Sequence, residues 1–306
     1  MNLLSVGDQV ERGSYTVHSR FKRAVNFSNG RGLVFLVSRE IEAGPLNIVL
    51  EGAGLHQALA RVSCLRVEEH LLEIDERRFN VDRSHCYRSD FTLQDCRAAR
   101  LPLNLALFRQ LLADASASNS LAFLIASERV GNFTSAVERA FISRIQRGGE
   151  QLFGGSLLEG VSLLKGCGAG LTPSGDDFIA GVLIGLHLLQ QLRQRELRLV
   201  IDKIFRAATG NNIFSNTFLD LASRGLLFEK IEKLIVAILG EEADAVRVAA
   251  LELFAIGATS GADLGTGFLM TLLEENGAVM RWKREVALLG RTRDIHVNQL
   301  RERCSP

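Results

Sequence analysis

The segment from residue 166 to residue 177, GCGAGLTPSGDD, most constrains what this chain can fold into, because a long apolar run follows it directly. Alternating glycines such as Gly168 and Gly170 give the backbone conformations closed to other residues and let a ligand approach the main chain. Residue types that cap helix N-termini or suit a first helical turn come next: Thr172, Pro173, Ser174 and Asp176. The segment therefore predicts a loop that leads into a buried helix covering residues 178–189.

Such a loop predicts a binding site for an anion. A helix N-terminus presents unpaired N–H groups and a partial positive charge, which together can hold a phosphate or a carboxylate. Asp176 and Asp177 would compete with that anion unless a cation bridges them, so both are candidate ligands of Mg²⁺. The candidate anion-binding residues are Gly168, Gly170, Thr172, Ser174 and Gly175.

A second segment repeats part of the first. Residues 174–183 align without gaps on residues 260–269 and share Ser-Gly-x-Asp-x-x-x-Gly-x-Leu at an offset of 86 residues (263 − 177). We predict that the two helix starts face each other around one pocket, with Asp177 and Asp263 as paired catalytic acids and Asp176 in support. Candidate ligand contacts from the second copy are Thr259, Ser260 and Gly261. The alternative is structural, because Ser, Asp and Gly commonly cap and pack helices.

A third polar segment lies between the two copies. Residues 209–217, TGNNIFSNT, run into another apolar stretch, so Asn212 and Ser215 are candidates to supply an amide and a hydroxyl to the same pocket. A capped helix start without a ligand explains this pattern equally well.

The composition indicates a well-buried globule of one large or two modest domains. Among 306 residues, 47% are hydrophobic and 23% charged, and 36 Lys and Arg nearly balance 35 Asp and Glu. No global field attracts nucleic acid or an anionic membrane, so small-molecule or protein partners are expected. The apolar run is too short to cross a bilayer, and the first residues lack a signal-peptide pattern, which predicts a cytoplasmic protein. Five widely spaced cysteines without a C-x-x-C pair predict reduced thiols.

The periodicity changes along the chain and predicts an α+β protein. Before about residue 95, short β-branched or alternating segments such as 14–19, 33–37 and 47–50 predict a β-rich N-terminal domain, residues 1–95. From about residue 97, helical spacing predicts a larger, bundle-like α-helical domain, residues 96–306. In its last part, the basic residues between Arg281 and Arg303 indicate a basic contact surface or, given the interspersed acids, a solvated face.

Several common catalytic motifs do not occur in the sequence. There is no G-x-x-x-x-G-K-[ST] phosphate loop, no H-E-x-x-H and no G-x-S-x-G, and the six histidines lie outside both motif copies. The sequence therefore does not favour histidine-based catalysis.

At residues 168–177 and 257–263 the chain resembles the AllH-like family, which includes a subunit of bacterial oxamate carbamoyltransferase. The RAVN segment at residues 23–26 and the Gly44–Pro45 turn extend this resemblance to the N-terminal part. The resemblance implies a role in anaerobic allantoin breakdown, where a multi-subunit enzyme interconverts oxalurate plus phosphate with oxamate plus carbamoyl phosphate. Ala258 departs from the family pattern, because relatives carry a histidine there.

The resemblance implies a carbamoyltransferase subunit that works with partner subunits on a small anionic substrate. Carbamoyl transfer needs a phosphate clamp, donors for the developing oxyanion and a base. We assign the N–H groups of residues 168–174, with Thr172 and Ser174, to anion or oxyanion contacts. Asp177 and Asp263 are candidates for the base or for a Mg²⁺ ligand, with Asp176 in support. Two alternatives remain open: a non-catalytic assembly subunit that binds a small carboxylate or a nucleotide, and a Mg²⁺-dependent hydrolase that uses the paired Asp residues.

Overall fold

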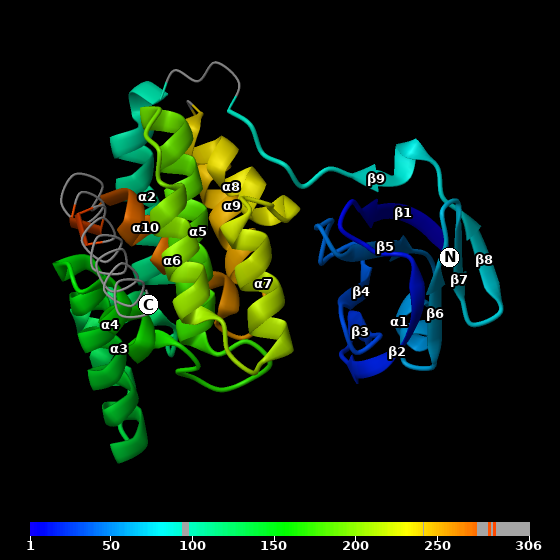
Figure 1. The fold of residues 1–306 in the computed structure, drawn as a ribbon, viewed down its shortest axis with the longest axis horizontal. Helices are drawn as coiled ribbons and strands as arrows, with labels where there is room; N and C mark the ends of the chain where they lie inside the picture. The colour runs from blue at the N-terminus through cyan, green and yellow to red at the C-terminus, as the bar shows by residue number, and fades with distance from the viewer. Residues whose placement is uncertain (94–97, 241, 274–280, 283, 286–306) are drawn as a thin grey trace, which may run out of the picture.

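The computed structural model of the chain consists of a strand-rich part followed by a helical part (Figure 1). It describes residues 1–93, 98–240, 242–273, 281–282 and 284–285. All β-strands of these residues lie between Asn2 and Tyr87, and the long helices begin at Leu101. The predicted α+β fold class is confirmed.

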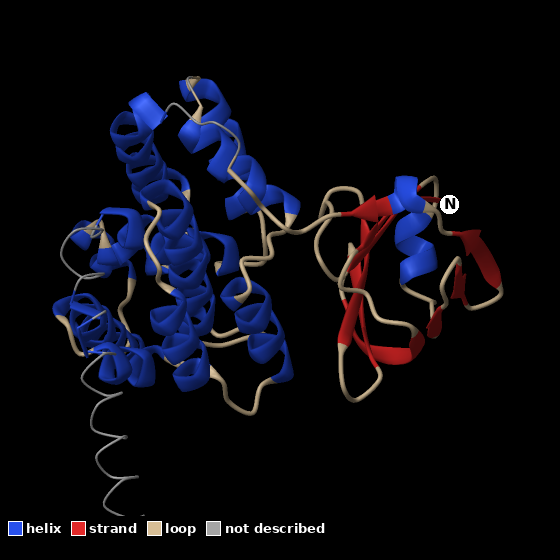
Figure 2. Cartoon of the chain, turned by 45° about the horizontal axis from the view of Figure 1, so that its top comes forward, coloured by secondary structure: helices blue, strands red, loops and turns tan. Residues whose placement is uncertain are grey.

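The N-terminal part is a curled sheet of nine strands in the described residues (Figure 2). The strands are β1 (Asn2–Gly7), β2 (Gly13–Arg20), β3 (Ala24–Ser28), β4 (Leu33–Ser38), β5 (Asn47–Glu51), β6 (Cys64–Val67), β7 (Leu71–Ile74), β8 (Arg77–Asn80) and β9 (Cys86–Tyr87). Their spatial order is β8-β7-β6-β2-β3-β4-β5-β1-β9, with β4–β5 and β1–β9 parallel. The short helix α1 (Leu55–Leu59) lies between β5 and β6.

Both faces of the central strands are buried, which explains why β4 is apolar at almost every position. Phe27 and Leu36 belong to the sheet's own core on one face. On the opposite face Phe35 stacks on Phe218 at 5.6 Å between ring centroids and also contacts Phe214, both from the helical part. The sheet is therefore fastened to the helices through an apolar cluster.

The helical part is built around one almost fully enclosed helix. Its α-helices are α2 (Leu101–Ala115), α3 (Ala136–Gly154), α4 (Leu157–Leu164), α5 (Ser174–Arg193), α6 (Arg198–Ala208), α7 (Ile213–Ser223), α8 (Glu229–Leu239), α9 (Ala243–Phe254) and α10 (Ser260–Leu273). Its short 3-10 turns are η2 (Ala98–Arg100), η3 (Leu121–Leu124) and η4 (Ser127–Asn132), and a further one, η1 (Arg83–His85), precedes β9 in the strand-rich part. Every residue of α5 from Ser174 to Leu186 is buried, which confirms the prediction of a helix surrounded by others.

The start of α5 differs from the sequence-based expectation. Pro173 lies at the N-cap position rather than in the first turn, and no side chain caps this helix. The N–H of Gly175 instead donates to the carbonyl of Cys167 at 2.8 Å, so the preceding loop satisfies one of the donors that a capping side chain would bind.

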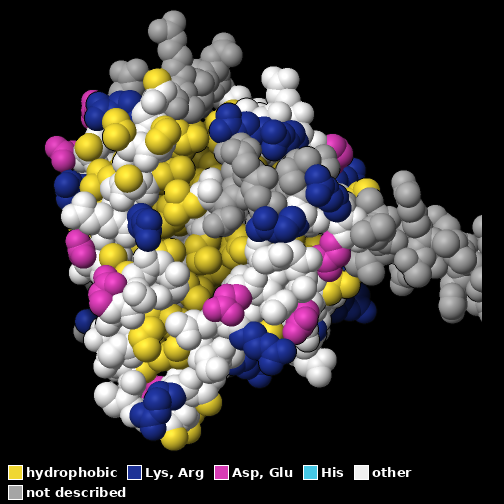
Figure 3. Space-filling view, turned by 90° about the vertical axis from the view of Figure 1, so that its left-hand side faces the viewer, with side chains coloured by type: hydrophobic (Ala, Val, Ile, Leu, Met, Phe, Trp, Pro, Cys, Tyr) yellow, Lys and Arg dark blue, Asp and Glu magenta, His cyan; other side chains and the backbone are white. Residues whose placement is uncertain are grey.

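No helix in the described part is both long and apolar enough to cross a membrane. On the face of the helical part shown in Figure 3, basic and acidic side chains are interspersed among apolar ones. This mixture agrees with the near-zero net charge of the sequence. Most of the predicted basic segment between Arg281 and Arg303 lies outside the described residues.

Candidate functional site

Helices α5 and α10 pack in parallel through two matching contacts. A Cβ at Gly181 would lie 2.0 Å from the carbonyl oxygen of Leu264, and a Cβ at Gly267 would lie 2.1 Å from that of Phe178. The two contacts are equivalent, because Gly267 lies 86 positions after Gly181 and Leu264 lies 86 positions after Phe178. This is the offset that separates the two motif copies. Only glycine permits this approach. One turn further along both helices, a Cβ at Gly185 would lie 2.9 Å from Thr271, and at the helix starts Ser260 hydrogen-bonds Asp177, so the helices run parallel and their N-termini lie side by side.

Hydroxyl groups from both motif copies meet at these N-termini. Thr172 Oγ1 donates to Asp177 Oδ2 at 3.1 Å and lies 3.3 Å from Ser260 Oγ of the second copy. The structure therefore brings residues 88 positions apart in the sequence into one site. Two helix N-termini close together favour negative charge between them.

Asp263 is a fully buried carboxyl group with one oxygen unpaired. Its Oδ1 accepts the N–H of Leu121, in η3, at 2.6 Å. Its Oδ2 has no hydrogen-bond partner among the described residues and no contact with solvent. Burial raises the pKa of Asp263 to about 6, although the Leu121 N–H and the hydroxyls of Ser174 and Thr259 lower it in part. The group can thus hold or release a proton close to neutral pH.

Asp177 is the second buried acid and faces Asp263. It is 8% exposed, and burial holds its pKa well above the ordinary value. Hydrogen bonds from Ser260 and Thr172 lower this pKa, whereas the charge of Asp263 raises it. Two buried carboxyls that repel each other favour a state in which at least one of them is protonated.

Asp176 lies apart from this pair, although it is adjacent in sequence. Its Oδ1 accepts the N–H of Gly166 at 2.7 Å, and its Oδ2 accepts the hydroxyl of Ser215 at 2.6 Å. Both oxygens of Asp176 therefore fix the loop and α7 to the start of α5. Asn212 completes this connection, because it caps α7 and its Nδ2 donates to the carbonyl of Leu171 at 2.8 Å.

The loop between α4 and α5 presents free backbone donors. Within the described chain, none of the N–H groups from residue 168 to residue 172 donates to a protein acceptor. Gly168 has a φ of +126°, and a Cβ there would lie 2.5 Å from the nitrogen of Ser174, so the loop conformation requires glycine. Residues 168–170 are exposed, which leaves their donors accessible to a ligand.

The structure separates the predicted residues into three groups. Four contact or neighbour the acid pair at the helix N-termini: Thr172, Ser174, Thr259 and Ser260. Gly175 and Gly261 serve packing, because a Cβ at either position would lie 1.9 Å from a carbonyl oxygen of the preceding helix. Asn212 and Ser215 hold the loop. No sequence pattern indicated the N–H of Leu121, which comes from the distant turn η3.

A metal ligand set of three or more His, Cys, Asp or Glu side chains does not occur in the described part of the chain. Both oxygens of Asp176 accept hydrogen bonds from the protein, and Asp177 accepts them from Thr172 and Ser260. The Mg²⁺ site stays a prediction.

Two family models match the chain, one over each part of the fold. Residues 2–88 match the AllH family N-terminal domain, and residues 164–272 match the oxamate carbamoyltransferase subunit AllH. The chain belongs to the AllH family. The second AllH match contains the loop, the acid pair and both parallel helices, so the site lies within the part that carries the family signature. Comparisons with curated proteins and with solved structures gave no match.

Proposed function

We propose that this chain is the subunit of an oxamate carbamoyltransferase-like enzyme that binds carbamoyl phosphate, with its phosphate at the loop of residues 168–172. Membership of the AllH family supports a subunit role. The observation that carries the proposal is the pair of parallel helix N-termini, which lie beside a loop whose backbone donors are free. Both features favour a bound anion.

The acid pair supplies the proton chemistry of the proposed transfer. The amide nitrogen of oxamate attacks the carbamoyl carbon of carbamoyl phosphate, a C–N bond forms, and the C–O bond to phosphate breaks with its electron pair leaving on phosphate. The attacking nitrogen must lose a proton, and we assign Asp177 as the acceptor. Asp177 is hydrogen-bonded to Thr172, which is only half-buried, so of the two acids Asp177 lies closer to the open side of the site. Asp263, behind it, exchanges a proton with Asp177. The unpaired backbone N–H groups of the loop are the donors for the oxyanion, because the hydroxyls of Thr172 and Ser260 already bind Asp177.

Two basic side chains of the described residues near the loop, Lys165 and Arg144, are engaged elsewhere. Lys165 donates to the carbonyls of Ala207 and Thr209, and Arg144 donates to those of Leu163 and Lys165. We infer that a partner subunit supplies the cationic contribution to the phosphate clamp, in keeping with a family described as an enzyme subunit.

The engagement of Lys165 and Arg144 in other hydrogen bonds also favours a second candidate function. A subunit whose basic groups are already paired can bind the anion and organise the assembly without performing chemistry. The two functions differ in what happens when Asp177 is changed, because binding of an anion does not need a base there, whereas transfer does.

Phosphate release from carbamoyl phosphate in the presence of oxamate tests the proposal, measured on the full chain alone and with the proteins that co-purify with it. Asp177→Asn should abolish turnover while phosphate still binds, and Asp244→Asn, at an exposed position of α9, should leave both unchanged. Full turnover by Asp177→Asn would refute the role of Asp177. Turnover by neither preparation, with phosphate bound, would support the non-catalytic subunit.

A further inference from the structure

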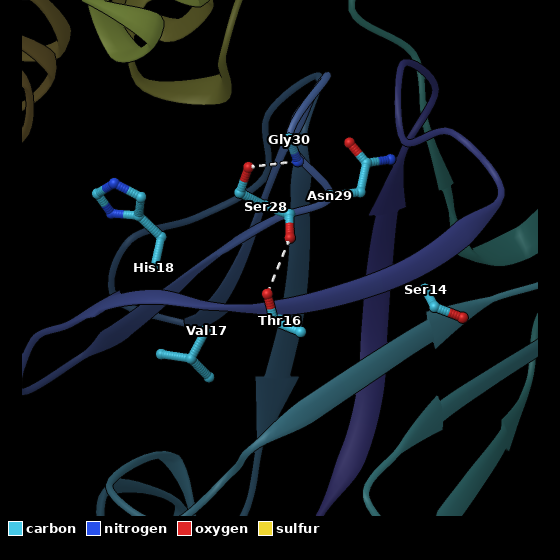
Figure 4. Close-up of a pocket in the computed structure, with 7 residues that line it drawn as sticks. All are labelled: Ser14, Thr16, Val17, His18, Ser28, Asn29 and Gly30. Atoms are coloured by element: carbon cyan, nitrogen blue, oxygen red, sulfur yellow. Dashed lines mark hydrogen bonds between the residues drawn. The ribbon is translucent and has the colours of Figure 1, made fainter.

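A depression of about 350 Å³ on the N-terminal sheet is lined by residues of β2 and of the turn after β3 (Figure 4). Its polar side chains do not converge on one ligand. His18, the extra residue of a β-bulge in β2, turns toward Phe214 of the helical part, whereas Ser14 lies at the other end of the depression. In the helical part, by contrast, several polar groups of the described residues converge on the buried side chain of Arg129.

Arg129 lies in η4 and binds the C-terminus of α2. Its guanidinium donates to the carbonyls of Ala113 and Ala117 and, at 3.1 Å, to the carbonyl of Ser116. The last carbonyls of a helix have no partner within the helix and carry partial negative charge, so a cation is stabilising there. A guanidinium presents five N–H donors in one plane and can bind several carbonyls at once. Arg129 therefore joins the end of α2 to the turn of residues 116–120 that follows it.

This turn leads directly to the donor that binds Asp263. The hydroxyls of Ser116 and Ser120 lie 3.0 Å apart, and Arg129 Nη2 lies 3.5 Å from the Ser120 hydroxyl. Both serines are buried, where an unpaired polar group is costly, so these contacts hold the turn in place. The peptide bond after Ser120 supplies the N–H of Leu121, which donates to Asp263 Oδ1 at 2.6 Å.

We propose that Arg129 is a positioning residue for Asp263. It fixes the turn of residues 116–120, and the turn fixes the N–H that orients the Asp263 carboxyl. Because Asp263 Oδ2 has no hydrogen-bond partner among the described residues, this orientation depends strongly on the bond at Oδ1. The effect of the orientation on carbamoyl transfer rests on the proposed function, whereas the coupling of Arg129 to Asp263 does not.

The loop of residues 168–172 is held by other contacts. Asn212 binds the carbonyl of Leu171, and Asp176 binds the N–H of Gly166 just before the loop. Loosening the turn that Arg129 holds should therefore change the rate of the proton transfer and leave the binding of phosphate unchanged.

The amide proton of Leu121 reports on the coupling directly, because a short, charge-assisted hydrogen bond moves an amide proton resonance downfield. The full chain labelled with ¹⁵N-leucine contains this resonance, which is assigned by its loss in Leu121→Met. In Arg129→Lys, which keeps the charge but not the planar fork, the resonance should move upfield. Its exchange with solvent should become about tenfold faster, as expected for the loss of one hydrogen bond. Arg147→Lys, in an exposed ion pair on α3, is the matched control and should change neither.

Turnover separates positioning from a merely structural role. With the co-purifying proteins present, Arg129→Lys should lower kcat for phosphate release about tenfold, a part of the roughly 10²–10⁴-fold that a general acid or base contributes. KM for carbamoyl phosphate should stay unchanged. A merely structural arginine would lower only the melting temperature. Ser120→Ala removes a single hydroxyl of the same turn and takes the place of Arg129→Lys if that variant does not fold.

An unchanged Leu121 resonance and exchange rate in Arg129→Lys and Ser120→Ala would overturn the inference. A displaced resonance together with an unchanged kcat would overturn the role of Arg129 in the reaction. Failure of the wild type to turn over would refute the proposed function, yet the Leu121 resonance would still decide whether Arg129 positions Asp263.

Discussion

Replacing Asp263 by Asn should stabilise the chain at alkaline pH, although it removes a group from the proposed site. Asp263 has an unfolded pKa of about 3.9 and a folded pKa of about 6. Because the folded chain binds the proton more tightly, the carboxyl contributes stability below about pH 4 that is lost as the pH rises through about 6. A difference of about two pKa units corresponds to roughly 3 kcal/mol. At pH 8 the ionised, unpaired Oδ2 therefore costs the wild type up to that amount.

Asn keeps an oxygen for the N–H of Leu121 and places a neutral amide where Oδ2 is buried. We expect Asp263→Asn to equal wild type near pH 4 and to exceed it by about 1–3 kcal/mol at pH 8. Urea denaturation followed by circular dichroism at several pH values measures this difference. Asp176→Asn is the matched control with the opposite sign, because Asn cannot accept from both Gly166 and Ser215, and an unpaired buried donor costs about 1–3 kcal/mol.

A wild-type stability that does not fall between pH 4 and pH 8, relative to Asp263→Asn, would refute the assignment of a raised pKa to a buried, unpaired carboxyl. If Asp263→Asn and Asp176→Asn destabilised the chain equally at pH 8, the proposed difference between the buried, unpaired Asp263 and the hydrogen-bonded Asp176 would be refuted.

Three further predictions follow from the same geometry. Gly181→Ala and Gly267→Ala should each cost about 1–3 kcal/mol in urea denaturation, since a methyl group would force α5 and α10 apart, whereas Gly154→Ala, with open space around it, should be neutral or slightly stabilising; equal effects in all three would contradict the contact. Asn212→Ala should lower the free energy of unfolding by about 1 kcal/mol through loss of the α7 cap, and it should speed amide hydrogen exchange in the loop of residues 166–172. Unchanged exchange would show that Asn212 does not hold the loop. Added Mg²⁺ should raise the melting temperature of wild type more than that of Asp177→Asn, and equal shifts would remove Asp177 as a metal ligand.

Local pattern in the sequence predicts most of the fold. Alternating and apolar runs correspond to strands such as β4 and β5, and helical spacing corresponds to α2 and α8, because burial of one face sets the period of each element. The apolar run after residue 177 also indicates the enclosed helix α5, since only a helix surrounded by others is apolar on all sides.

The internal arrangement of the site is less accessible to sequence reasoning. Asp176 and Asp177 look equivalent as neighbours, but successive helical side chains point about 100° apart, so one meets Ser215 and the other meets Ser260. The N–H of Leu121, which binds Asp263, comes from a residue 142 positions away. Such contacts depend on how helices pack, and no local pattern encodes them.

The bulge at His18 is a further example, because it arises from the register between β2 and β3. The sequence of β2 alone alternates normally at this position. Histidine in that strand therefore gave no indication of a contact with Phe214 from the helical part.

The central claim, that the loop before α5 binds the phosphate of carbamoyl phosphate, is tested most directly by a thermal-shift titration with phosphate and carbamoyl phosphate. Wild type should be stabilised by about 2.7 kcal/mol at a ligand concentration about 100 times the dissociation constant. Thr172→Val, which removes one proposed ligand contact, should need a higher concentration for the same shift, whereas Thr209→Val, whose hydroxyl bonds Phe205 at the end of α6, should behave as wild type. A shift that is identical in all three proteins, or absent from wild type, would contradict the account.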